Sequence, residues 1–130
     1  APLSRLANVH LPGEIPYAAV PAFLAAQDLV LVPFRDTPLT RAVDPVKLYE
    51  ALAAGVPVVA RRLPETARWA AQVALYDDPA ALPALLDREL AADDEQRRAA
   101  RRAAGAAESW AARAAAIERL VAGLIGFGSR

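Results

Sequence analysis

The sequence contains no cysteine, no methionine and a single histidine. Without cysteine the chain can form no disulfide, no thiolate metal site and no cysteine nucleophile, and one histidine excludes a histidine-rich metal centre. We therefore expect no zinc chemistry and no metal cofactor. The absence of methionine means that no translation start is present, so we expect the sequence to be a truncated piece of a longer protein.

Charge of one sign is not in excess, because 15 Lys and Arg residues balance 15 Asp and Glu residues. A neutral chain does not attract nucleic acid by its net charge, so we expect no nucleic-acid partner. No apolar run reaches the roughly 18 to 20 residues that span a bilayer. The N-terminus also lacks the basic and then apolar order of a signal peptide. These absences predict a cytoplasmic protein without a transmembrane segment.

The length of 130 residues suits one domain. Residues 1 to 78 alternate short apolar runs with helical stretches, whereas residues 79 to 126 have a helical pattern almost throughout. The segment over 28–34, in which an uninterrupted apolar run from Leu29 to Phe34 follows Asp28, is typical of a strand buried on both faces of a parallel sheet. The pattern predicts strands over 8–11, 28–34, 56–60 and 72–76, and helices over 16–26 with a bend at Pro21, over 44–55, and from 64.

Strands separated by helices predict parallel pairing with right-handed crossovers, hence an α/β fold with a Rossmann-like parallel sheet followed by a helical C-terminal tail. We expect residues 1–92 to form the sheet region and residues 93–130 to pack on it as a helical extension. Residues of the tail that we expect to form an apolar packing stripe are Trp110, Ile117, Val121 and Leu124. Those that we expect on a solvated helix, broken at Gly105, are Arg97, Arg98, Arg101 and Arg102. Trp69 is expected to be half-buried.

The helix over 44–55 carries the strongest candidate site. Asp44 and Pro45 predict an N-cap followed by proline in the first turn. Lys47, the only lysine, then lies in that turn, where the helix dipole disfavours a cation unless an anion such as phosphate binds there. Glu50 shares a helix face with Lys47, and its carboxylate suits paired sugar hydroxyls. The alternative is that Lys47 and Glu50 form an exposed ion pair worth a few tenths of a kcal/mol.

The polar loop over 35–43 precedes this helix and lies where ligands of α/β sheets bind, beyond the carboxyl ends of the strands. Arg35, Thr37, Thr40 and Arg41 are candidates to close over a diphosphate. An ordinary solvated loop remains the alternative. His10 has no partner for catalysis or metal binding in the sequence, and such a histidine is more typical of a surface or packing position.

The segment 44–59 reads DPVKLYEALAAGVPVV. It resembles the P-x-K-x-x-E-x-x-A-x-G-x-P-V-V signature of glycosyltransferases of the GT-B fold, in particular the family 4-like group, also called glycosyl transferases group 1. The turn over 13–17 and the strand over 28–34 are similar to that family as well. Ser109, Trp110 and Arg113 resemble its closing helix, so the resemblance covers nearly the whole chain.

The resemblance implies a nucleotide-diphosphate sugar donor and transfer of a hexosyl group to a glycan or lipid-linked acceptor. It implies that Lys47 contacts the donor phosphates and Glu50 the ribose, with Ile15, Pro16 and Tyr17 near the base. Ala42 stands where the family's E-x7-E pattern has its first glutamate. The base, the sugar and the retaining or inverting course therefore stay open.

The resemblance also implies that this chain is part of the C-terminal, donor-binding domain of a two-domain enzyme and is incomplete at its N-terminal side. The N-terminal GT-B domain would hold the acceptor, so we assign no catalytic residue here and expect no activity from this chain alone. An unpaired sheet edge would favour a homo-oligomer, and the full-length enzyme could attach peripherally to a membrane. Two alternatives are a non-catalytic α/β interaction module and a nucleotide-sugar epimerase-like domain.

Overall fold

The computed structural model describes residues 3–127 of the chain, with side chains described through residue 124. Its centre is a parallel sheet of β1 (Val30–Val32), β2 (Val58–Arg61) and β3 (Ala74–Tyr76), in the order β1-β2-β3. The helices are η1 (Leu3–Arg5), η2 (Tyr17–Ala19), α1 (Val20–Ala25), α2 (Pro38–Arg41), α3 (Val46–Ala54), α4 (Pro64–Ala67), η3 (Pro79–Ala81), α5 (Leu82–Ala91), α6 (Glu95–Ala107) and α7 (Trp110–Phe127). The predicted α/β fold with a parallel sheet and C-terminal helices is confirmed.

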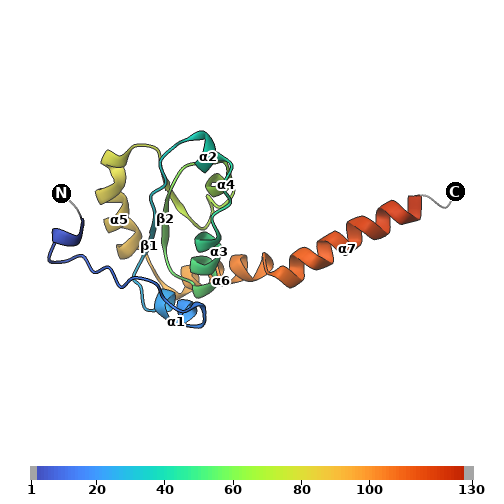
Figure 1. The fold of residues 1–130 in the computed structure, drawn as a ribbon, viewed down its shortest axis with the longest axis horizontal. Helices are drawn as coiled ribbons and strands as arrows, with labels where there is room; N and C mark the ends of the chain where they lie inside the picture. The colour runs from blue at the N-terminus through green and yellow to red at the C-terminus, as the bar shows by residue number, and fades with distance from the viewer. Residues whose placement is uncertain (1–2, 128–130) are drawn as a thin grey trace.

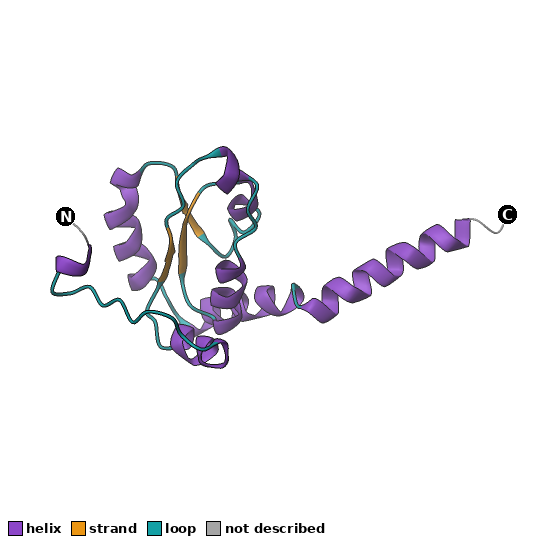
Figure 2. Cartoon of the chain, viewed as in Figure 1, coloured by secondary structure: helices purple, strands orange, loops and turns teal. Residues whose placement is uncertain are grey.

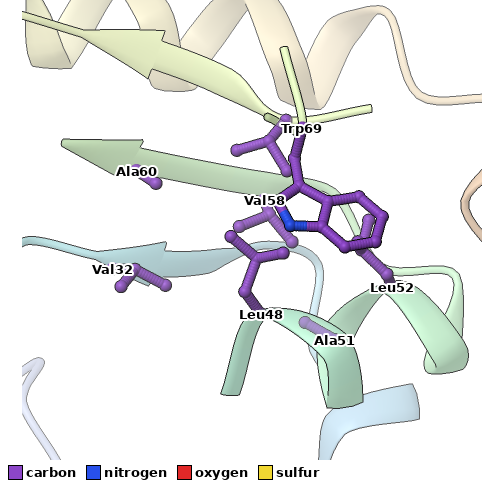
Figure 3. Close-up of a cluster of buried hydrophobic side chains, with 8 residues drawn as sticks. Val32, Leu48, Ala51, Leu52, Val58, Ala60 and Trp69 are labelled. Carbon is purple, nitrogen blue, oxygen red and sulfur yellow. The ribbon is translucent and has the colours of Figure 1, made fainter. Parts of the chain in front are cut away.

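Helices cover both faces of the sheet, with α5 on one side and α3 on the other (Figure 1). On the α3 side, Leu48 and Leu52 pack against Val58, and Trp69 closes the cluster (Figure 3). On the α5 side, Val59 packs with Tyr76 and Leu85. Successive residues of β2 thus point into different apolar layers, which explains why the strand has no polar alternation.

The turn between α3 and β2 is stabilised by contacts with α6. Gly55 ends α3 in the left-handed conformation, with φ of 80°, and its carbonyl accepts a hydrogen bond of 3.0 Å from Nε of Arg101. Arg101 also pairs with Asp93 and is only 6 % exposed. The prediction that Arg101 lies on a solvated helix face is therefore wrong. Its guanidinium is buried between α3 and α6, where it binds the carbonyl at the C-terminal end of α3.

The predicted break at Gly105 is also absent. α6 runs through Gly105 and ends at Ala107, and Ser109 then accepts a hydrogen bond of 3.2 Å from the Ala112 N–H in the first turn of α7. A Cβ at Gly105 would lie 2.7 Å from the backbone nitrogen of Ala53. Glycine at this position therefore permits close approach of α6 to α3 rather than interrupting the helix.

The helix α7 extends away from the body of the molecule (Figures 1 and 2). Its predicted packing stripe is exposed: the exposed fraction is 87 % for Trp110, 61 % for Ile117 and 75 % for Leu124. Within the described residues, no other element covers these three side chains of α7, whereas α6 of the same predicted extension packs on α3. Within residues 3–127, no helix has both the length and the apolar character needed to cross a membrane.

One further segment and one side chain differ from the predictions, and the helix expected over 16–26 agrees with its prediction in part. Residues 8–11 form no strand, since none of the three described strands pairs with them. The helix expected over 16–26 divides into η2 and α1, and Pro21 lies in the first turn of α1, as expected of a proline that restarts a helix. Trp69 is 7 % exposed and belongs to the core rather than being half-buried, because its ring meets the Tyr49 ring edge to face at 5.3 Å.

The contact at Gly105 predicts a large difference between two glycine-to-alanine substitutions. Alanine favours a helix by about 1 kcal/mol over glycine, so Gly123→Ala on α7, where a Cβ would meet nothing within 4 Å, should leave stability unchanged or raise it. Gly105→Ala should instead lower the free energy of unfolding by about 1–3 kcal/mol because it overpacks the α3–α6 contact. Urea denaturation of both variants measures this, and equal stabilities would contradict the close contact.

Candidate functional site

The N-terminus of α3 follows the loop that leaves β1. Pro45 is the N-cap residue and no side chain caps the helix, while the Leu48 N–H bonds the Pro45 carbonyl at 2.9 Å. The prediction that Asp44 is the N-cap is therefore wrong. The carboxylate of Asp44 instead accepts a hydrogen bond of 2.7 Å from the Tyr49 hydroxyl. In the part of the chain that the structure describes, no side chain accepts a hydrogen bond from the N–H groups of Val46 and Lys47 at the start of α3.

Lys47 lies in the first turn of α3, as predicted, and its side chain is exposed. Among residues 3–127, no ion pair includes Lys47, so the alternative of a surface pair between Lys47 and Glu50 is not formed. Glu50 is partly buried one turn further along α3. The helix therefore presents a free cation at its positive end, followed by a carboxylate.

Glu50 and Tyr17 line one pocket. Its volume is about 180 Å³, and it exists because α1 packs beside α3. Its other lining residues are Val20, Pro21, Leu24, Ala53 and Ala54. Tyr17 is 83 % exposed, so its ring is available to a ligand. Ile15 is partly buried and Pro16 is exposed; they lie next to Tyr17 in the chain but do not line the pocket, and neither does Lys47.

A second cavity, of about 590 Å³, opens at the carboxyl ends of the three strands. Arg35 from the loop after β1 and Arg61 from the end of β2 both line it, together with Asp77 and Asp78. The guanidinium of Arg61 lies 5.8 Å from the centre of the Tyr76 ring and donates to the Asp77 carbonyl, while its buried Nε has no partner among the described residues. Arg61 is not among the candidates predicted from the sequence, although a position at the end of a buried parallel strand indicates a residue near a ligand site.

The same turn is built twice at this edge, after β1 and after β2. In each, a single-turn helix begins with proline and has threonine as its third residue, at Thr40 in α2 and Thr66 in α4. Thr40 Oγ1 accepts from the Thr37 N–H at 3.0 Å and donates to the Arg35 carbonyl. Thr66 Oγ1 accepts from the Leu63 N–H at 2.9 Å and donates to the Arg61 carbonyl at 2.6 Å. Both threonines thereby fix the backbone of an arginine that lines the cavity.

Arg41 is held within its own loop. It forms two hydrogen bonds with Asp36, of 2.6 Å and 2.9 Å. The hydrogen bond to Arg41 lowers the pKa of Asp36, and the same bond raises the pKa of Arg41. The structure therefore places Arg35, Thr40 and Arg41 in one loop at the carboxyl edge, with the Thr40 hydroxyl and the Arg41 guanidinium already engaged.

No group of three His, Cys, Asp or Glu side chains in the described part of the chain is arranged to hold a metal ion. His10 is exposed in the irregular N-terminal segment. The groups available to a ligand are therefore the cations and helix N–H groups at the carboxyl edge, and the carboxylate and aromatic ring of the Tyr17–Glu50 pocket.

Comparison with known proteins gives two matches. The model of a family described as "Glycosyl transferase-like" matches residues 3–119. The chain is also similar to the putative teichuronic acid biosynthesis glycosyltransferase TuaH of Bacillus subtilis (strain 168), with 41 % identity over 66 residues. That alignment covers 51 % of this chain and 17 % of TuaH, so the chain spans only a small part of this relative. No solved structure matches.

The two turns predict different losses of stability for the same threonine-to-valine substitution. Thr66 is 1 % exposed, so Thr66→Val leaves the Leu63 N–H and the Arg61 carbonyl without their buried partner and should lower the free energy of unfolding by about 1–3 kcal/mol. Thr40→Val is the matched variant in the more exposed turn and should cost clearly less, because water can replace the hydroxyl. Chemical denaturation of both variants tests this, and an equal loss would show that burial does not set the cost.

Proposed function

Because the chain belongs to the glycosyl transferase-like family, we propose that it binds the nucleotide-diphosphate part of a sugar donor for hexosyl transfer to a glycan or lipid-linked acceptor. The observation that carries the proposal is the start of α3. There, Lys47 has no ion-pair partner among the described residues, and no side chain caps the helix. One turn further along, Glu50 lines a pocket with Tyr17.

The diphosphate is the part of the donor that Lys47 and the α3 N-terminus suit. A helix N-terminus offers unpaired N–H groups and a partial positive charge, and both favour a phosphate. A lysine at that position adds a charge-assisted hydrogen bond. Arg35 lies in the loop that leads to this helix and would extend the phosphate contacts along the carboxyl edge. Thr40 and Arg41 would join it only by exchanging their present hydrogen bonds to the Arg35 carbonyl and to Asp36.

The nucleoside suits the pocket between α1 and α3. The Glu50 carboxylate can accept hydrogen bonds from two ribose hydroxyls, and the exposed ring of Tyr17 offers a face on which a base can stack. Ile15 and Pro16 precede Tyr17 and would border the base.

The acceptor and the catalytic base are proposed to come from the rest of a longer two-domain enzyme, in which this chain would be part of the donor-binding domain. The small share of TuaH that the chain covers supports this. In the described sheet, β1 pairs with β2 on one edge only. Its other edge carries unpaired N–H and C=O groups, which a preceding strand of the longer protein, or a second copy of this chain, would satisfy.

Lys47→Ala should weaken binding of UDP or GDP by ~10- to 100-fold, since a hydrogen bond to a charged group contributes roughly 1.5–3 kcal/mol. Stability should barely change because the side chain is exposed. Arg119→Ala removes an exposed cation from α7 and serves as the control. Calorimetric titration measures both dissociation constants, and an unchanged affinity in Lys47→Ala with an intact fold would overturn the phosphate assignment.

Glu50 should distinguish a ribonucleotide from its 2′-deoxy analogue, because loss of one hydroxyl leaves a carboxylate oxygen unpaired in the complex. The wild-type protein should therefore bind UDP more tightly than 2′-deoxy-UDP. Glu50→Ala should abolish that preference, whereas Glu118→Ala on α7 should keep it. Competition binding with the two nucleotides reports the ratio, and a preference that survives in Glu50→Ala would assign the ribose to another residue.

A further inference from the structure

A chain of hydrogen bonds joins the first turn of α7 to the start of α3. Nη2 of Arg113 donates to the Tyr49 hydroxyl at 3.1 Å, and that hydroxyl donates to Oδ2 of Asp44 at 2.7 Å. The guanidinium of Arg113 also lies 5.2 Å from the centre of the Tyr49 ring and 4.0 Å from Asp44 Oδ2. Glu108 accepts a further hydrogen bond from Arg113 at 3.2 Å. Tyr49 is thus the acceptor of one bond and the donor of the next.

Asp44 connects this series of hydrogen bonds to the N-terminus of α3. Asp44 lies directly before the N-cap residue Pro45 and three residues before Lys47. An aspartate so near a helix N-terminus commonly bonds the free N–H groups. A carboxylate there would occupy the groups that a phosphate needs, and its negative charge would repel the phosphate. In this structure the hydroxyl of Tyr49 holds that carboxylate instead.

The donor of the hydrogen bond is itself well fixed. The Tyr49 ring meets the buried Trp69 ring edge to face at 5.3 Å, so the hydroxyl is anchored to the core. Burial, and then the hydrogen bond to Asp44, raise the pKa of Tyr49. The hydroxyl therefore keeps its proton, and with it the bond to Asp44, through the neutral pH range.

We propose that Tyr49 and Arg113 are positioning residues that hold the Asp44 carboxylate away from the N-terminus of α3 and so keep that end open to the donor diphosphate. This proposal rests on the proposed function, since it concerns the same phosphate end of α3. It adds two residues that need not touch the donor. It also makes the contact between α7 and α3 a determinant of donor affinity.

The test is a rescue experiment with UDP and GDP as probes. Tyr49→Phe keeps the ring but frees Asp44, so it should weaken binding by about tenfold through the nearby negative charge. Asp44→Asn introduced into Tyr49→Phe should restore the wild-type affinity, because the amide carries no charge. Arg113→Ala should weaken binding less, and Asp44→Asn should restore it as well. Thermal unfolding of each variant verifies the fold, and Lys47→Ala is measured in parallel.

The outcomes separate the two proposals. Weakening by Tyr49→Phe that Asp44→Asn reverses supports the positioning role, since a loss of packing would not be repaired by removing a charge. If Tyr49→Phe binds as the wild type does while Lys47→Ala loses affinity, the positioning role is overturned and the proposed function stands. If Tyr49→Phe weakens binding and Asp44→Asn fails to reverse the loss, the positioning role is overturned as well. Absence of nucleotide binding by the wild-type protein would overturn both proposals.

Discussion

The burial of one face of α3 against the sheet is the interaction on which the rest of the structure depends. Leu48, Ala51 and Leu52 are completely buried, and they pack on β1 and β2. Their spacing fixes the rotation of the helix about its axis, so Lys47 and Glu50 are placed away from the sheet. The orientation of the residues proposed to bind the donor is therefore set by buried apolar side chains that do not themselves contact the donor.

The second support of α3 comes from the opposite end of the sequence. α6 approaches the C-terminal part of α3 closely at Gly105, and Arg101 takes up the carbonyl that the left-handed Gly55 leaves exposed. A helix held by the sheet on one side and by α6 on another has little freedom to shift. Such rigidity is what a phosphate site made of backbone N–H groups requires, because those groups have no side-chain torsions by which to adjust.

The sequence predicted the parallel sheet and the position of α3 because long-range burial leaves a local signature there: uninterrupted apolar runs, proline at the helix start and glycine at its end. It failed where a contact joins distant segments. Arg101 looked like a solvated cation because its partners, Gly55 and Asp93, cannot be identified from spacing. Asp44 looked like an N-cap because local propensity cannot show that Tyr49 competes for it. The apolar stripe of α7 predicted a packing face, yet periodicity does not identify the surface that covers it.

The attachment of α7 by Arg113 has a mechanical consequence. An α-helix rises about 1.5 Å per residue, so Leu124 lies roughly 20 Å from Trp110 along the helix axis. A tilt of about ten degrees at the first turn would move Leu124 by roughly 3–4 Å, whereas the Arg113 side chain would move only by a fraction of that. A partner bound to the far part of α7 would therefore act through the Arg113–Tyr49 hydrogen bond. A large displacement at Leu124 would become a small displacement beside the start of α3.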